Sequence, residues 1–132
     1  MTSLQLAVNK ISDITAISGL TSLQNLALNK NNISDISALK DLVNLQILGI
    51  ALNSITDISP LQNLKNLQYL FMNYNNISDI SALSELIKLK SLYLGGNSII
   101  DFSPVKSYYN NLTGKDFEIT KGKVAAGEII TE

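Results

Sequence analysis

The chain has 132 residues, of which 45% are hydrophobic, and its formal net charge at pH 7 is −1. This composition suits a single soluble domain, and so small a net charge excludes a strong electrostatic attraction to nucleic acid or to an anionic membrane. Every basic residue is lysine, and histidine and cysteine are absent; we therefore expect no cofactor, no metal site, no disulfide and no nucleic-acid partner.

A 22-residue repeat starts at the first residue and has the form L-x-x-L-x-L-x-x-N-x-I-x-D-I-x-x-L-x-x-L-x-x. Its copies predict five coils of chain, over residues 1–22, 23–44, 45–66, 67–88 and 89–105. A fixed period of this length predicts a solenoid. Two polar positions keep the period throughout, forming an asparagine ladder (Asn9, Asn31, Asn53, Asn75, Asn97) and an aspartate ladder (Asp13, Asp35, Asp57, Asp79, Asp101).

The two halves of each repeat predict different local structures. In the first half, apolar residues such as Leu70 and Met72 alternate with their neighbours, which indicates a strand. In the second half, apolar residues recur every third position, which favours a short 3₁₀ or α turn. A serine precedes this turn in four coils, where we expect it to act as an N-cap, and a proline follows in two of them, in the first turn. These residues are Ser37, Ser59, Ser81 and Ser103, with Pro60 and Pro104.

The two ends of the chain depart from the repeat. Residues 1–9 already fit the strand half and show no capping element or signal peptide, so the first strand is expected to present an open edge. At the other end, Asn111 and Asp116 fall where the 22-residue period requires leucine. We therefore expect residues 106–132 to form a C-terminal cap, with two short strands over residues 117–120 and 128–131. The predicted division is 1–105 for the repeats and 106–132 for the cap.

Both ladders have a structural interpretation. An asparagine side chain carries a donor and an acceptor, so each ladder asparagine is expected to bond backbone groups of its own coil and of the next one. Each aspartate is expected to accept backbone N–H groups where the turn begins. A calcium column is the alternative for the aspartates, and one carboxylate per coil without a ligand loop disfavours it.

These motifs resemble the leucine-rich repeat family, and the 22-residue spacing with I-x-D-I-[ST]-x-L is similar to its internalin type. The resemblance covers about residues 1–105. It implies an α/β, right-handed leucine-rich-repeat solenoid, with parallel strands on the concave face, short 3₁₀ or α turns on the convex face and a small C-terminal β cap. The phosphatase-regulating repeat proteins of eukaryotes, which are cytosolic, are the nearest alternative family. The internalin type implies a parent protein that is secreted or lies on a bacterial surface.

In such a solenoid, residues between the core leucines point out of the concave face. In the third to fifth coils several of these are large and apolar, and core packing does not require them. An exposed cluster of this kind indicates an interaction surface. Glycines at positions 49, 95 and 96 are expected to let a partner approach the backbone. The predicted partner-binding residues are Ile47, Leu52, Tyr69, Phe71, Tyr74 and Tyr93.

Three functions follow, from three different classes. The first is a non-enzymatic module that binds another protein through the concave aromatic face. The second is a self-associating scaffold that forms a homodimer through the uncapped N-terminal edge. For the aromatic residues themselves, the alternative to a partner site is that they pack on each other or meet a crystal or homodimer neighbour. The third, an enzyme, requires an acid/base pair, and the regular carboxylate ladder without histidine or cysteine argues against it.

Overall fold

The computed structural model describes residues 1–119 and 129–130. Five coils repeat one strand and one 3₁₀ helix, and further strands follow the last helix. The strands are β1 (Ser3–Gln5), β2 (Asn25–Ala27), β3 (Ile47–Gly49), β4 (Tyr69–Phe71), β5 (Ser91–Tyr93), β6 (Gly114–Lys115), β7 (Glu118–Ile119) and β8 (Ile129–Ile130). The 3₁₀ helices are η1 (Thr15–Ile17), η2 (Ser37–Leu39), η3 (Ser59–Leu61), η4 (Ser81–Leu83) and η5 (Ser103–Asn111).

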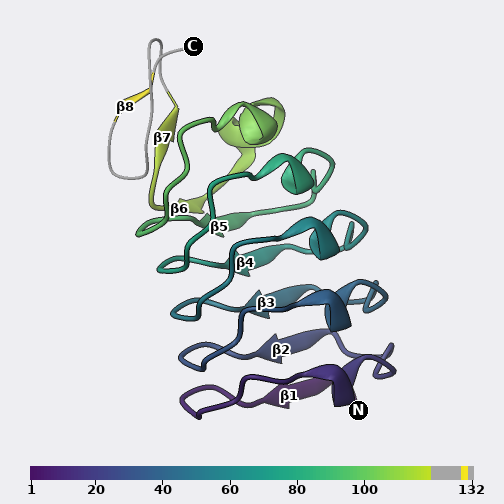
Figure 1. Ribbon diagram of the computed structural model, residues 1–132. Coiled ribbons are helices and arrows are strands. Elements are labelled where there is room, and N and C mark those ends of the chain that lie inside the picture. Colours follow the sequence, from purple (N-terminus) through teal and green to yellow (C-terminus); the bar gives the residue numbers. More distant parts are fainter. Residues whose placement is uncertain (120–128, 131–132) are drawn as a thin grey trace.

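The first six strands form one parallel sheet in the order β1-β2-β3-β4-β5-β6, and the 3₁₀ helices form a second stack along one side of this sheet (Figure 1). Neighbouring strands pair at the repeat distance, so that Leu26 lies beside Leu48 and Leu48 beside Leu70. The predicted right-handed solenoid of strands and 3₁₀ turns is therefore confirmed. Within the described residues, no helix is long and apolar enough to cross a membrane.

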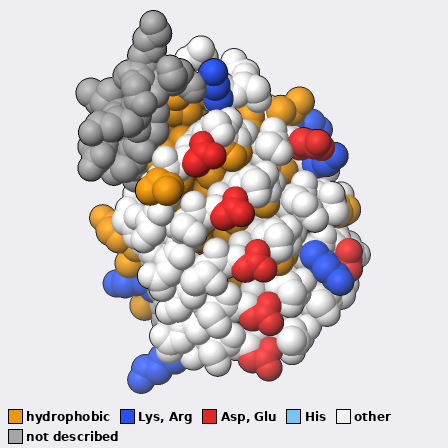
Figure 2. Space-filling view, turned by 45° about the horizontal axis from the view of Figure 1, so that its top comes forward, with side chains coloured by type: hydrophobic (Ala, Val, Ile, Leu, Met, Phe, Trp, Pro, Cys, Tyr) orange, Lys and Arg blue, Asp and Glu red, His pale blue; other side chains and the backbone are white. Residues whose placement is uncertain are grey.

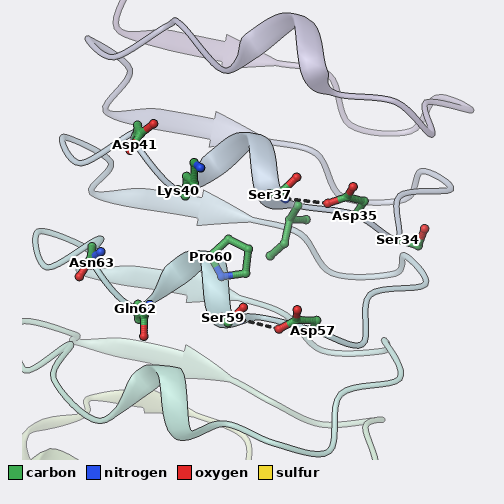
Figure 3. Close-up of a pocket in the computed structure, with 11 residues that line it drawn as sticks. Ser34, Asp35, Ser37, Lys40, Asp41, Asp57, Ser59, Pro60, Gln62 and Asn63 are labelled. Carbon is green, nitrogen blue, oxygen red and sulfur yellow. Dashed lines mark hydrogen bonds between the residues drawn. The ribbon is translucent and has the colours of Figure 1, made fainter.

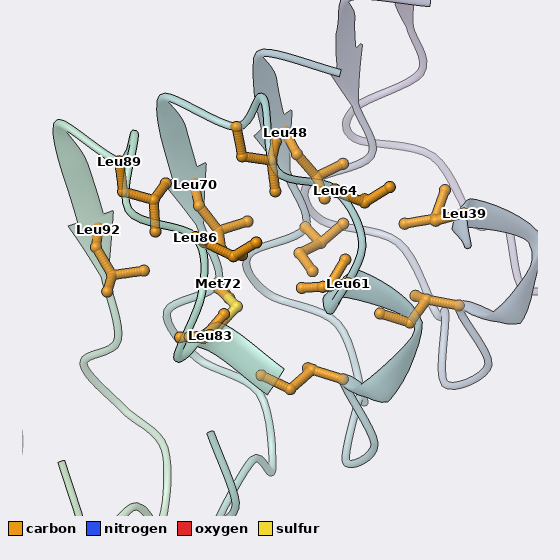
Figure 4. Packing of buried hydrophobic residues seen from close by; sticks show 14 of the residues in the cluster. Leu39, Leu48, Leu61, Leu64, Leu70, Met72, Leu83, Leu86, Leu89 and Leu92 are labelled. Carbon is orange, nitrogen blue, oxygen red and sulfur yellow. The ribbon is translucent and has the colours of Figure 1, made fainter. Parts of the chain in front are cut away.

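The core lies between the sheet and the 3₁₀ helices. Leu70 and Met72 enter it from the strand side, and Leu83 and Leu86 enter from the turn side, all with 0% exposure (Figure 4). Strands β1 to β5 and helices η1 to η4 have only three residues each, lengths too short to be stable alone. Burial of these apolar rows against the neighbouring coils therefore stabilises the elements.

An aspartate lies two residues before the first residue of each 3₁₀ helix. Asp35 Oδ1 accepts the backbone N–H of Ser37 at 2.9 Å, and the same bond recurs in every coil. The prediction that serine is the N-cap is therefore wrong. Ser37 is already the first helical residue, Ile36 occupies the cap position without a side-chain bond, and the aspartate supplies the missing acceptor. Pro60 lies in the first turn as predicted.

The repeat continues beyond the point where the 22-residue period fails. Ser91 pairs with Gly114, which is 23 residues further on. The long helix η5 supplies the additional residue, and with it Leu112 and Phe117 enter the core. Two of the apolar slots are filled one residue later than the period predicts, by Leu112 after Asn111 and by Phe117 after Asp116, whereas Lys115 takes the strand slot of Leu92. The sheet extends to Lys115, and the division at residue 105 stays a prediction.

The C-terminal strands β7 and β8 pair with each other, at two of the places where strands are predicted. Against the last coil, the ring of Phe117 stacks on Phe102 with 5.2 Å between centroids, and Tyr109 packs on Phe117 at 5.7 Å. The buried Tyr108 donates its hydroxyl to the carbonyl of Leu83 at 2.8 Å. These aromatic residues cover the end of the leucine core. The predicted link of residues 121–127 lies outside the described residues, as do residues 120, 128 and 131 of the two predicted strands.

A column of residues in the left-handed backbone region was not anticipated. It follows the strands, with φ between 57° and 72°, and consists of Val8, Lys30, Leu52, Tyr74 and Gly96. Only Gly96 adopts such a φ without strain. The same conformation in four different side-chain types shows that stacking of the coils imposes it. Glycine at one of five positions was the single signal in the sequence.

We expect Val8→Gly to stabilise the protein by about 1 kcal/mol, because it removes the strain of a β-branched residue at positive φ. The Val8 side chain is 70% exposed, so little packing is lost. Urea unfolding of the variant measures the change. Val43→Gly is the matched control, because Val43 is also exposed and has no positive φ; it should destabilise the fold. A Val8→Gly protein less stable than the parent would contradict the strain.

Candidate functional site

The concave face is the side of the six-stranded sheet that points away from the leucine core. Strand β4 shows the alternation clearly. Leu70 has 0% exposure, whereas Tyr69 and Phe71 on either side of it are half-buried and reach the surface. Ile47, beside Tyr69 on β3, is 38% exposed. Tyr93 on β5 is half-buried. Four of the six predicted partner-binding residues therefore lie on three adjacent strands.

Two of the aromatic rings form a fixed pair. Phe71 and Tyr93 are register partners on β4 and β5, and their rings stack with centroids 5.2 Å apart and an interplanar angle of 13°. Stacked rings lose little further freedom when a ligand covers them. The pair also explains why neither ring is fully exposed, because each covers one face of the other.

The other two predicted residues belong to the left-handed column beside this face. Leu52 is 43% exposed and Tyr74 58% exposed. The Tyr74 ring lies over Gly96, the equivalent position of the next coil, where an added Cβ would collide with it. Gly96 therefore leaves space for the ring of Tyr74, which extends the apolar surface of the concave face along one side. Together Ile47, Leu52, Tyr69, Phe71, Tyr74 and Tyr93 form what we call the aromatic patch.

The predicted role of the glycines as approach points for a partner is wrong. A Cβ at Gly49 would lie 2.5 Å from the amide of Asn29, and one at Gly95 would lie 2.6 Å from Asp116. These side chains fill the space because they bond the neighbouring strand. Asn29 Oδ1 accepts the N–H of Ala51 at 2.8 Å, which leaves Ala51 buried rather than on the face. The Asp116 oxygens accept the N–H groups of Leu94 and Gly95.

The asparagine ladder lies at the bend after each strand. Asn53 Nδ2 donates to the carbonyls of Ile50 at 3.1 Å and Leu28 at 3.0 Å, and its Oδ1 accepts the N–H of Ile33 at 3.0 Å. Leu28 and Ile33 belong to the preceding coil, so the expectation of bonds to the next coil is wrong in direction. The same pattern recurs at Asn31, Asn75 and Asn97.

A second, shorter asparagine ladder lies before the strands. Asn44 Nδ2 donates to the carbonyl of Thr21 at 2.8 Å, and Asn66 Nδ2 donates to the carbonyl of Val43 at 3.0 Å. In the next coil Lys88 takes the position and its Nζ donates to Asn66 Oδ1. The 22-residue spacing of these residues was visible in the sequence, but two members among polar neighbours did not distinguish them from an ordinary loop.

The aspartate ladder forms a column of acidic side chains across successive coils (Figure 2). The pKa values of Asp13, Asp35, Asp79 and Asp101 are lowered because each carboxylate accepts hydrogen bonds from the residue two positions on. At Asp13, Asp35 and Asp79 the hydrogen bond from the backbone N–H is the larger cause of the lowered pKa. At Asp101 the larger cause of the lowered pKa is the hydrogen bond from the hydroxyl of Ser103. Within residues 1–119, no three carboxylates come together in a group that could hold a metal ion.

We expect the melting temperature to be constant above about pH 5 and to fall below about pH 4. The folded state lowers these four pKa values, so an unfolded chain binds more protons as the pH drops through the usual range for aspartate. The stability contribution is present above the unfolded pKa and is lost as the pH falls through the folded one. Thermal melts between pH 7 and pH 2.5 measure this. Asp35→Asn with Asp79→Asn should flatten the decline, and Asp41→Asn, outside the column, should not.

The convex side carries open grooves between successive turns. One of these grooves has a volume of about 520 Å³ and lies between η2 and η3 (Figure 3). Asp35 and Asp57 bond the residues that begin these helices, and Lys40 and Asp41 bring both signs of charge to the rim. The groove thus holds carboxylates already used as helix acceptors.

Three stretches of the chain, residues 1–41, 43–85 and 65–107, match the family described as Leucine Rich repeats (2 copies). Comparison with curated protein sequences gives no match.

Among solved structures, the chain is similar to two internalins of Listeria monocytogenes. Internalin InlF is 46% identical over 91% of this chain and 35% of its own, with a TM-score of 0.84. Internalin C2 is 41% identical over 87% of this chain and 50% of its own, also with a TM-score of 0.84. A plant peptide hormone receptor, RGFR1 in complex with RGF2, shares the fold at 22% identity and a TM-score of 0.71, over 90% of this chain and 22% of its own. This chain thus spans between about a third and a half of the length of the two internalins.

Proposed function

The chain belongs to the leucine-rich repeat family, with repeats of the internalin-like type, and from this premise we propose that it is a non-enzymatic module that binds another protein through the aromatic patch. The fold alone supports no more than protein binding in general, because one fold can serve many unrelated functions. The identities of 46% and 41% to internalins favour this type over the phosphatase-regulating repeat proteins. We further propose that the parent protein is secreted or displayed on a bacterial surface.

The observation that supports the proposal is that the aromatic patch lies at the surface, while the inward positions of the same strands are already filled by leucine. Leu48, Leu70 and Leu92 fill the inward slots of β3, β4 and β5 with 0% exposure. Stability does not require large rings on the opposite face, where the first two coils carry small or polar residues instead. Phenylalanine and tyrosine are residue types that anchor protein interfaces, and the stacked pair supplies them in one fixed geometry.

The test is capture of partners from the surface proteins of candidate host or neighbouring cells, quantified for the parent protein and for Tyr69→Ala with Phe71→Ala. The double variant should lose the captured proteins, because both rings lie at the centre of the patch. Ile87→Ala with Ile100→Ala is the matched control, because these residues are 66% and 84% exposed and lie outside the patch. Equal capture by all three proteins would refute the role of the patch.

Self-association is the second candidate, and the N-terminal end of the solenoid supports it. Leu4, Leu6 and Ile11 are half-buried, whereas the residues in the same slots of the second coil are at most 1% exposed. Met1 is 69% exposed, and β1 is the edge strand of the sheet. An isologous homodimer would cover this end. Light scattering distinguishes the candidates, because an obligate dimer favours self-association and a monomer favours the aromatic patch.

A further inference from the structure

Resting on the proposed function of the aromatic patch, we propose that the patch binds a short, acidic segment of a partner protein: about seven residues, apolar in the middle and with a carboxylate at each end. Three features of the face carry this inference. They are the distribution of charge, the size of the patch and the positions of two lysines.

Among residues 1–105 the carboxylates lie on the convex side of the solenoid, where lysines such as Lys40 also lie. The aspartate ladder lies at the starts of the 3₁₀ helices, away from the concave face. Asp116 is the one carboxylate beside the described strands of the face, and its oxygens are occupied by the N–H groups of Leu94 and Gly95 at 2.7 and 2.9 Å. The cations of the face are Lys30 and Lys90, both exposed, and neither forms an ion pair within residues 1–119. A partner with carboxylates at its edges can therefore pair with these two lysines.

The patch is small. Its residues lie on or beside three adjacent strands, β3 to β5, which span roughly 10 Å at about 4.8 Å per strand, and Tyr69 and Phe71 are roughly 7 Å apart along β4. A typical interface between globular proteins covers about 800 Å² on each partner. The apolar centre here is several times smaller, with the polar Asn25 and Asn29 on one side and Asp116 on the other. This area fits a few side chains of one segment.

The two lysines lie at opposite corners of the face. Lys30 follows β2 in the left-handed column, and Lys90 immediately precedes β5. Three strand spacings across and six residues along place their backbones roughly 24 Å apart, and the line between them crosses Tyr69 and Phe71. A segment of about seven extended residues covers this distance at about 3.3 Å per residue. Its middle residues then contact the rings while its ends meet the lysines.

The test uses a phage-displayed library of random 12-residue peptides selected on the parent protein. We expect enriched peptides to carry apolar or aromatic residues with an aspartate or glutamate on each side, about six positions apart. For a synthetic peptide of the enriched sequence, Lys30→Glu with Lys90→Glu should raise the Kd about tenfold or more, and added salt should reduce the difference. Lys40→Glu with Lys88→Glu, which changes the same charge on the convex side, is the matched control.

Each outcome decides one proposal. Enriched peptides that are basic or neutral, peptides unaffected by the Lys30 and Lys90 reversal, or no enrichment at all would overturn the acidic segment. Peptides that bind the Tyr69→Ala and Phe71→Ala variant as tightly as the parent would instead overturn the aromatic patch as the binding surface. Loss of binding with both double variants but not with the control supports the inference.

Discussion

Leu70→Ala is expected to lower the free energy of unfolding by roughly 3–5 kcal/mol. Leu70 is the central residue of β4, has 0% exposure, and is paired on both sides with leucines of the same slot, Leu48 and Leu92. The change removes buried methyl groups and leaves a cavity that the tightly stacked coils above and below cannot close. Urea unfolding followed by circular dichroism measures the loss.

The first coil provides the control for this substitution. Leu4 occupies the same slot as Leu70, but it is only half-buried because no coil covers it on one side. Leu4→Ala should therefore cost about 1 kcal/mol, by the smaller apolar area that it removes from contact. Equal losses at Leu4 and Leu70 would contradict the account of a core that is complete in the middle of the solenoid and open at β1.

Asn53→Leu is expected to cost roughly 2 kcal/mol or more, although it replaces a polar residue with an apolar one. The substitution leaves the carbonyls of Leu28 and Ile50 and the N–H of Ile33 without the partner that they have in the structure. These hydrogen-bonded groups are partly buried at the bend between strand and turn. An unpaired polar group in such a place costs ~1–3 kcal/mol.

Asn9→Leu separates this effect from any general cost of leucine at the bend. Asn9 is exposed and donates only to the carbonyls of Leu6 and Ala7 in its own coil. Its replacement should change the free energy of unfolding by about 1 kcal/mol or less, as loss of a hydrogen bond usually does. If Asn53→Leu melts at the same temperature as the parent protein, the asparagine ladder does not hold the coils together.

The sequence predicted the architecture because the 22-residue period determines which residues of neighbouring strands pair. Leucines spaced 22 residues apart must occupy equivalent slots of successive coils, and the pairing of Leu26, Leu48 and Leu70 follows directly. The alternation around Leu70 also placed Tyr69 and Phe71 on the other face. Both conclusions depend only on which residues repeat and on the side-chain geometry of a strand.

Other features depend on contacts that the pattern does not encode. The period does not say whether Asn53 bonds the coil before or after its own, because both are offset by one repeat. Gly49 and Gly95 looked like open backbone, whereas Asn29 and Asp116 fill their spaces from adjacent coils. The positive φ of Leu52 is imposed by the stacking of the coils, and local propensity opposes it.

The single additional residue near the end of η5 could not be located from the sequence. A helix of nine residues replaces the three-residue turn of the other coils, and its length fixes where the next strand begins. Asn111 and Leu112 are adjacent, so either could have entered the core slot on local pattern alone. Burial of Leu112 and Phe117 together decides in favour of the shifted register.

The central claim is that the aromatic patch lies on a core that does not need it, and the unfolding free energy of Tyr69→Ala with Phe71→Ala tests this most directly. Both rings flank Leu70 on the same strand, so the comparison with Leu70→Ala holds the position in the solenoid constant. The account predicts a loss within about 1 kcal/mol, as is usual for surface changes and for a lost ring stack. A loss as large as that of Leu70→Ala would show that the rings belong to the core and would contradict the proposed binding face.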